Sequence, residues 1–201
     1  MRKLFYRPVD PWVVTQRFGE NNVCIDNATG KRVISCDGRK PPAGYRSVYS
    51  LMRGHNALDV AAKRWQPIYA AADGTVDEVE TEESRGLGVG VRHDFGADGL
   101  WKTRYWHMVA LDVHKGDKVK TGELIGYADS TGLSTNDHVH FELKPLLPSG
   151  KNKFQDNGYF GAVDPTPWMH DSFALKFSLL TQLRELAAKL LDMLSDRVRR
   201  R

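Results

Sequence analysis

The chain has 201 residues, a formal net charge of +4 at neutral pH and a pI of about 9.0. This length suits one domain of ordinary size, with room for an appendage. The basic excess is small and scattered, so it does not predict nucleic-acid binding, although it favours anionic surfaces such as a bacterial wall or membrane. The first residues lack the apolar run of a secretory signal, and no stretch resembles a membrane span.

Two cysteines, Cys24 and Cys36, flank a stretch rich in glycine, aspartate and asparagine. They could close a disulfide loop or remain free thiols, and the sequence does not decide between these states. Residues 8–20 predict one edge strand. Residues 21–45 are polar and contain Pro41-Pro42, which predicts a long loop with at most one hairpin.

Short β-type segments separated by glycine breaks follow from Pro67 onward. Asp73-Gly74 and Asp98-Gly99 are typical turn dipeptides between such segments. Because no helical period intervenes, the pattern predicts a mainly β fold, an antiparallel sheet or sandwich. The strands expected from this pattern lie within residues 67–79, 88–94, 101–108 and 113–127.

The tail differs from the rest of the chain. From Asp171 onward apolar residues recur every three or four positions, which predicts an amphipathic helix capped by Asp171 or Ser172. We therefore expect a domain over residues 1–168 and a C-terminal helix over 169–201. This helix could dock on the sheet, pair with a second copy of itself or contact an anionic membrane surface.

The most informative stretch runs from His138 to Leu143. In a strand, side chains alternate in direction, so His138 and His140 would project from one face while Val139 and Phe141 pack on the other. Two histidines at this spacing can also decorate any exposed strand. Other parts of the chain must therefore decide whether they form a site.

A second pair of metal-capable residues lies four positions apart, at His55 and Asp59. Together with His140 they would form a set of two histidines and one carboxylate, which leaves a fourth position open, as in catalytic zinc sites. His107 and His138 would then be unligated imidazoles beside one Zn²⁺ ion, able to move a proton or to stabilise an oxyanion.

Three segments resemble the motifs of the lysostaphin-like (LytM-type) zinc metallopeptidases, peptidase family twenty-three. They are Gly54–Asp59, Tyr105–His107 and His138–Leu143, and the similarity covers about residues 45–145. The chain departs from the family pattern at Ala57, where glycine is common, and at Asn136-Asp137, which precedes the final histidine pair. These departures could alter loop geometry or substrate choice, and they leave the five candidate residues in place.

The resemblance implies zinc ligands at His55, Asp59 and His140 and catalytic histidines at His107 and His138. It further implies an endopeptidase that hydrolyses stem peptides or cross-bridges of peptidoglycan, acting on the bacterial cell wall outside the cytoplasm. Without a visible signal peptide, we expect either a phage lysin or a bacterial enzyme whose export signal has been removed.

Two alternatives remain open. A non-catalytic scaffold of the same fold would bind the wall or activate another hydrolase, and a peptidase of ordinary proteins would share the same chemistry. The remaining histidines, His93, His114 and His170, are expected to be ordinary surface or packing residues.

Overall fold

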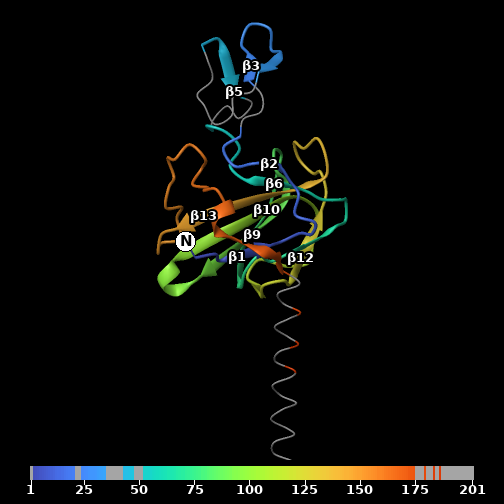
Figure 1. Ribbon diagram of the computed structural model, residues 1–201, viewed down its shortest axis with the longest axis vertical. Helices are drawn as coiled ribbons and strands as arrows, with labels where there is room; N and C mark the ends of the chain where they lie inside the picture. The colour runs from blue at the N-terminus through green and yellow to red at the C-terminus, as the bar shows by residue number, and fades with distance from the viewer. Residues whose placement is uncertain are drawn as a thin grey trace, which may run out of the picture.

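The computed structural model of the protein describes residues 2–20, 24–34, 43–47 and 52–174, together with Leu179, Leu183 and Leu186. Figure 1 shows a body built almost entirely of strands, with a small separate sheet at one end. The strands are β1 (Phe5–Arg7), β2 (Val14–Gln16), β3 (Cys24–Asp26), β4 (Arg32–Ile34), β5 (Tyr45–Ser47), β6 (Leu58–Ala61), β7 (Pro67–Tyr69), β8 (Gly74–Glu82), β9 (Gly86–Asp94), β10 (Leu100–Leu111), β11 (Lys118–Val119), β12 (Leu124–Ala128), β13 (His138–Leu146) and β14 (Met169–Phe173). Two 3₁₀ turns, η1 (Gly96–Asp98) and η2 (Thr166–Trp168), complete these elements.

Nine strands form the central sheet, in the order β11-β8-β9-β10-β13-β6-β2, with β12 pairing with β10 and β7 away from this path. Every pairing in this sheet is antiparallel. The expected antiparallel β fold is therefore confirmed, and β2 lies at the edge of the sheet, as predicted for residues 8–20. The turn at Asp98-Gly99 joins β9 to β10, where Gly99 has a φ of 89° that favours glycine.

The two faces of β13 have different partners. Val139, Phe141 and Leu143 are fully buried in the hydrophobic core, and Tyr105 on β10 pairs with Phe141 on the same side. On the other face His140 pairs with Trp106, and the polar residues continue along both strands. The alternation predicted for this stretch is therefore confirmed, because the period of two places each set on one side.

The segment expected to be a long loop contains more structure than predicted. It provides β3, β4 and the first residue of β5, and these strands form an antiparallel sheet in the order β4-β3-β5. The antiparallel pair of β3 and β4 is the one hairpin that the expectation allowed, and β5, which begins at the end of this segment, adds a third strand. Cys36 lies outside the described residues, so the cysteine pairing stays undecided.

The tail also differs from its prediction. Residues 169–173, where the helix was expected to begin, form β14, which pairs in parallel with β1. Its pairing partner lies at the other end of the chain, so local periodicity could not reveal the pairing. Most later residues lie outside the described part. Ala174, Leu179, Leu183 and Leu186 are helical, and the three leucines are 51–63% exposed.

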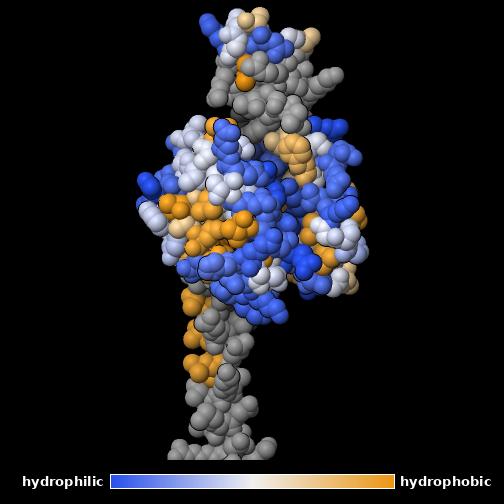
Figure 2. Space-filling view, turned by 180° about the vertical axis from the view of Figure 1, so that it is seen from behind, coloured by the Kyte–Doolittle hydropathy of each residue, from blue (hydrophilic) through white to orange (hydrophobic). Residues whose placement is uncertain are grey.

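In Figure 2 most of the visible surface of the body is hydrophilic, with apolar patches between the polar areas. Among the residues that the structure describes, no helix is long and apolar enough to cross a membrane.

His93 on β9 was expected to be either a surface or a packing residue. It is fully buried, which agrees with the packing role. Its Nδ1 lies 2.8 Å from the carbonyl oxygen of Asp73, and its Nε2 lies 2.8 Å from the hydroxyl of Thr103. The Thr103 and Tyr105 hydroxyls are hydrogen-bonded at 3.0 Å, and the amide of Ala71 donates to Tyr105. Burial lowers the pKa of His93 to about 4, which keeps the imidazole neutral inside the core.

This buried histidine predicts a pH-dependent stability. Between its ordinary pKa of 6.5 and about 4, the unfolded chain takes up a proton that the folded chain does not, so the free energy of unfolding falls as the pH falls. Between pH 7.5 and 4.5 the free energy of unfolding of the wild type, measured with urea, should fall by about 2–3 kcal/mol more than that of His93→Gln. The exposed His114→Gln is the control and should follow the wild type. If the free energies of unfolding of wild type and His93→Gln changed with pH in parallel, the prediction would be contradicted.

Candidate metal centre

The candidate site forms where β13 lies beside β6. His140 pairs with Asp59 in the antiparallel register, so their side chains project from the same face. His55 precedes β6 in the chain and reaches the same point from the adjoining loop. Three residues that are up to 85 positions apart in sequence are thus brought together.

Their polar atoms form a tight triangle. Nδ1 of His140 lies 2.9 Å from Oδ1 of Asp59, and Nε2 of His55 lies 3.1 Å from each of these atoms. A tetrahedral zinc ion with bonds of about 2.0–2.1 Å would require ligand atoms roughly 3.3 Å apart. The edges of the triangle fall close to this spacing, so the set fits a small divalent ion.

The position of the proton on His55 also supports the binding of a divalent ion. Nδ1 of His55 lies 3.3 Å from the carbonyl oxygen of Arg17, which can only accept, so this nitrogen carries the proton. Nε2 of His55 therefore presents a lone pair toward the carboxylate of Asp59. Two electron-rich atoms this close repel each other, and a cation between them would remove the repulsion.

His55 is held by the segment that follows β2. Its amide donates to the carbonyl of Glu20, and the amide of Gly19 donates to the carbonyl of His55, both at 2.7 Å. Gly54 allows this approach, since a Cβ there would lie 2.4 Å from the carbonyl oxygen of Gly19. The segment that follows the edge strand thus orients a candidate ligand.

His107 reaches the site because β10 is irregular at this point. Regular alternation would turn it away from the face on which Trp106 lies, toward the core. Instead His107 has a φ of 64°, and the register of β10 with β9 shifts between Tyr105 and Met108. Such a bulge re-aims the side chain and stores about 1–3 kcal/mol of strain. As a result the ring centroid of His107 lies 4.6 Å from that of His138.

His107 and His138 are oriented in the same way. Nδ1 of His107 donates to the carbonyl of Thr131 at 2.6 Å, and Nδ1 of His138 donates to that of Asn136 at 2.8 Å. In each histidine Nδ1 is thereby occupied, so Nε2 is the nitrogen that faces the site. Nε2 of His138 lies 3.5 Å from Oδ1 of Asp59.

The surroundings shift the pKa values of these side chains in different directions. Burial lowers the pKa of His107 to about 4, so this imidazole is neutral at pH 7. Burial is also the largest single influence on His138, but the hydrogen bond with Asp59, the charge of Asp59 and the hydrogen bond to Asn136 together outweigh it and raise the pKa. Burial alone would raise the pKa of Asp59, yet the hydrogen bonds from His138 and His140 lower that pKa far below the usual range.

All five candidate residues from the sequence therefore lie together. A second group that could hold an ion consists of His107, His138 and His140, whose ligand atoms lie within 4.8 Å of one another. The tighter triangle of His55, Asp59 and His140 matches zinc spacing better. Sequence reasoning assigned no role to Glu142, although its place on the polar face of β13 was a signal.

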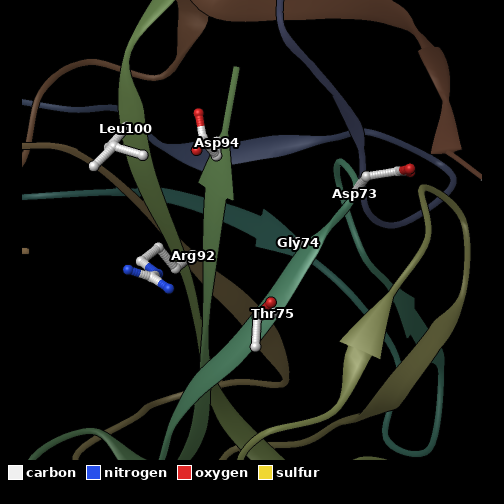
Figure 3. Close-up of a pocket in the computed structure, with 6 residues that line it drawn as sticks. All are labelled: Asp73, Gly74, Thr75, Arg92, Asp94 and Leu100. Atoms are coloured by element: carbon white, nitrogen blue, oxygen red, sulfur yellow. The ribbon is translucent and has the colours of Figure 1, made fainter. Parts of the chain in front are cut away.

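A separate pocket of about 360 Å³ lies at the other end of β10 and is lined by Asp73, Gly74, Thr75, Arg92, Asp94 and Leu100 (Figure 3). Leu100 is seven residues from His107, about 23 Å along an extended strand. The Asp73 carboxylate is already bound by Lys120 and Thr121. This pocket is therefore not part of the histidine centre.

An antiparallel sheet that carries two histidines and a carboxylate at metal-binding distance, with two further histidines beside them, defines a candidate metallohydrolase centre. Comparison with known families agrees with this class. The pattern of Peptidase family M23 matches residues 53–155, just over half of the chain, and the chain belongs to this family.

Individual relatives match over the same region. The chain is 36% identical over 89 residues to the peptidoglycan DD-endopeptidase ShyB of Vibrio cholerae, covering 44% of this chain and 20% of the relative. It is 32% identical over 116 residues to the glycyl-glycine endopeptidase ALE-1 of Staphylococcus capitis, covering 57% and 29%. It thus spans less than a third of the length of these curated relatives.

A solved structure described as a zinc containing peptidase from Vibrio cholerae has 26% sequence identity and a TM-score of 0.54. The match covers 85% of this chain and 41% of that one. The fold similarity therefore extends beyond the matched family segment.

The geometry predicts which residues hold a divalent ion. His55→Ala and His140→Ala each remove a corner of the triangle, so the zinc affinity should fall by about a hundredfold or more, whereas His107→Ala should keep it within a few-fold. Zinc titration against a chromophoric chelator measures this, with the exposed His114→Ala as the control. An equal loss in His107→Ala would instead favour the group of His107, His138 and His140.

Proposed function

We propose that the protein is a zinc-dependent endopeptidase that hydrolyses peptide bonds in the stem peptides or cross-bridges of peptidoglycan. The observation that carries this proposal is the triangle of His55, Asp59 and His140, with edges of 2.9–3.1 Å, beside two further histidines. Membership of Peptidase family M23 supports the reaction class.

Zinc is the ion that best suits these residues. Two imidazole nitrogens and one carboxylate oxygen in a compact triangle are typical of catalytic zinc, which keeps one position open. The side chains of Asp59 and His138 are 13% and 15% exposed, so one side of the triangle can be reached from solvent. When bound here, zinc would supply Lewis acidity that acidifies water and polarises a carbonyl group.

His107 and His138 would move the protons. Their Nδ1–H groups are held by the carbonyls of Thr131 and Asn136, which fixes the rings and presents both Nε2 atoms. One of the pair would accept a proton from the attacking water, and a proton would return to the leaving amine. An imidazolium of the pair would also stabilise the developing oxyanion.

The names of the relatives support peptidoglycan as the substrate. One acts as a peptidoglycan DD-endopeptidase and another as a glycyl-glycine endopeptidase. Peptidoglycan is the polymer of the bacterial cell wall, so we propose that this chain acts at the wall, outside the cytoplasm. A lytic role in a phage remains a prediction, as does contact of the C-terminal segment with a membrane surface or a second copy.

The zinc-loaded protein should release new amino groups from purified peptidoglycan. His138→Ala should lower the rate by about 10²–10⁴-fold with an unchanged zinc content, because a proton-transfer group is lost while the ligands remain. His114→Ala, a change to a side chain that is 95% exposed, is the matched control and should keep full activity.

Chelation should abolish the activity and added zinc should restore it. Walls with direct D-alanyl cross-links and walls with glycine bridges, analysed by mass spectrometry, would identify the bond that is cut. The proposal is wrong if the folded, zinc-loaded protein releases no new amino groups from either wall. Digestion of casein with no effect on walls would instead indicate a peptidase of ordinary proteins.

A further inference from the structure

His140 is oriented differently from the other three histidines of the site. His55, His107 and His138 each direct Nδ1 toward a backbone carbonyl and Nε2 toward the centre. In His140 this order is reversed, because Nδ1 belongs to the triangle and Nε2 points away from it. The outer nitrogen of His140 therefore requires a different acceptor.

That acceptor is a carboxylate. Oε1 of Glu142 lies 3.4 Å from Nε2 of His140, on the same face of β13. Both residues are buried, and Glu142 is completely inaccessible to solvent. Within the described chain no hydrogen bond satisfies Nε2 of His140, so a closing of a few tenths of an ångström onto Glu142 would supply the missing one.

The position of Glu142 is set by groups that donate to its first oxygen. The side-chain amide of Asn56 donates to Oε1 at 3.1 Å, and Arg85 lies 3.4 Å from the same atom. Asn56 immediately follows the candidate ligand His55, so one short segment supplies a ligand and fixes the acceptor of another. Arg85 in turn lies over the ring of Trp106 at 4.7 Å.

The second oxygen faces two more cations. Nζ of Lys144 lies 3.1 Å from Oε2, and Arg104 lies 3.7 Å from it. An isolated buried carboxylate would be very unfavourable, and these positive charges offset its desolvation. The protein thus keeps a buried, negatively charged acceptor directly behind a candidate zinc ligand.

We propose that Glu142 is a positioning residue of the metal centre. It accepts the Nε2–H of His140 and so fixes the tautomer in which the Nδ1 lone pair is directed at the ion. A carboxylate behind a ligating imidazole also raises the basicity of that ligand. This inference rests on the proposed function, because it assumes that His140 binds zinc.

A purely structural role for Glu142 would be to neutralise the neighbouring cations. Glu78 on β8 provides the matched control for that role. It is also a buried carboxylate, and its ion pairs in the described chain are with Arg104 and Lys102 rather than with a histidine of the site. Loss of charge at Glu78 should therefore disturb the same buried network without affecting the orientation of His140.

The test compares the zinc affinity of Glu142→Gln, Glu142→Asp and Glu78→Gln with that of the wild type, by chelator competition at one pH. Glu142→Asp keeps the charge beside the cations but withdraws the oxygen from His140. Both Glu142 variants should bind zinc about 10–100-fold more weakly, and Glu78→Gln should stay within about threefold. Cobalt(II) absorption spectra should change in the Glu142 variants alone, because the ligand geometry loosens.

If the variants fail to fold, a measurement on the wild type still tests the inference. In the zinc-loaded wild type, nitrogen-15 NMR of the imidazoles should show His140 bound to the metal through Nδ1 and protonated at Nε2. Coordination through Nε2 would overturn the inference, as would a folded Glu142 variant with wild-type zinc affinity and cobalt spectrum. An equal loss of affinity in Glu78→Gln would also overturn it in favour of the structural role.

These outcomes are separate from a failure of the proposed function. If the wild type binds no zinc, or if His140→Ala binds it normally, the proposed metal centre is wrong and the role of Glu142 falls with it. If the wild type binds zinc and cleaves peptidoglycan while the Glu142 variants retain full zinc affinity, only the positioning role is wrong.

Discussion

The structure depends on one electrostatic constraint, the close approach of electron-rich atoms from His55, Asp59 and His140. Atoms of this kind separated by 2.9–3.1 Å repel one another unless a proton or a cation lies among them. The antiparallel register of β13 with β6 leaves these side chains little freedom to move apart. The rigid core behind Val139 and Phe141 therefore holds an arrangement that a divalent ion would stabilise.

The same sheet separates two environments. One face contributes fully buried apolar residues, and the other carries a network of charges in which Glu142, Arg104 and Lys144 are largely hidden from solvent. Buried ion pairs contribute little to stability on their own, because desolvation offsets most of their attraction. We therefore attribute this network to the orientation of the site, with the apolar face providing most of the folding free energy.

Several features could be predicted from local patterns. Alternation in β13 places His138 and His140 on one face, and the turn at Asp98-Gly99 joins two strands. Local patterns failed where the partner of a segment is distant. Residues 169–173, where the C-terminal helix was expected to begin, pair with β1 as a strand, and β5, which begins at the end of the expected loop, pairs with β3. Pairing of this kind depends on residues far away in sequence, which no local window contains.

The sequence by itself determined the β character of the chain, the five candidate site residues and the family that their motifs resemble. These follow from residue types and short spacings, which are local properties. Only the tertiary structure decided that His107 is turned to the site by a bulge, that His140 uses the opposite nitrogen from His55, and that Glu142 lies behind it. Backbone irregularity and the atom that each ring presents depend on packing between distant strands, so they arise only when the sheet is assembled.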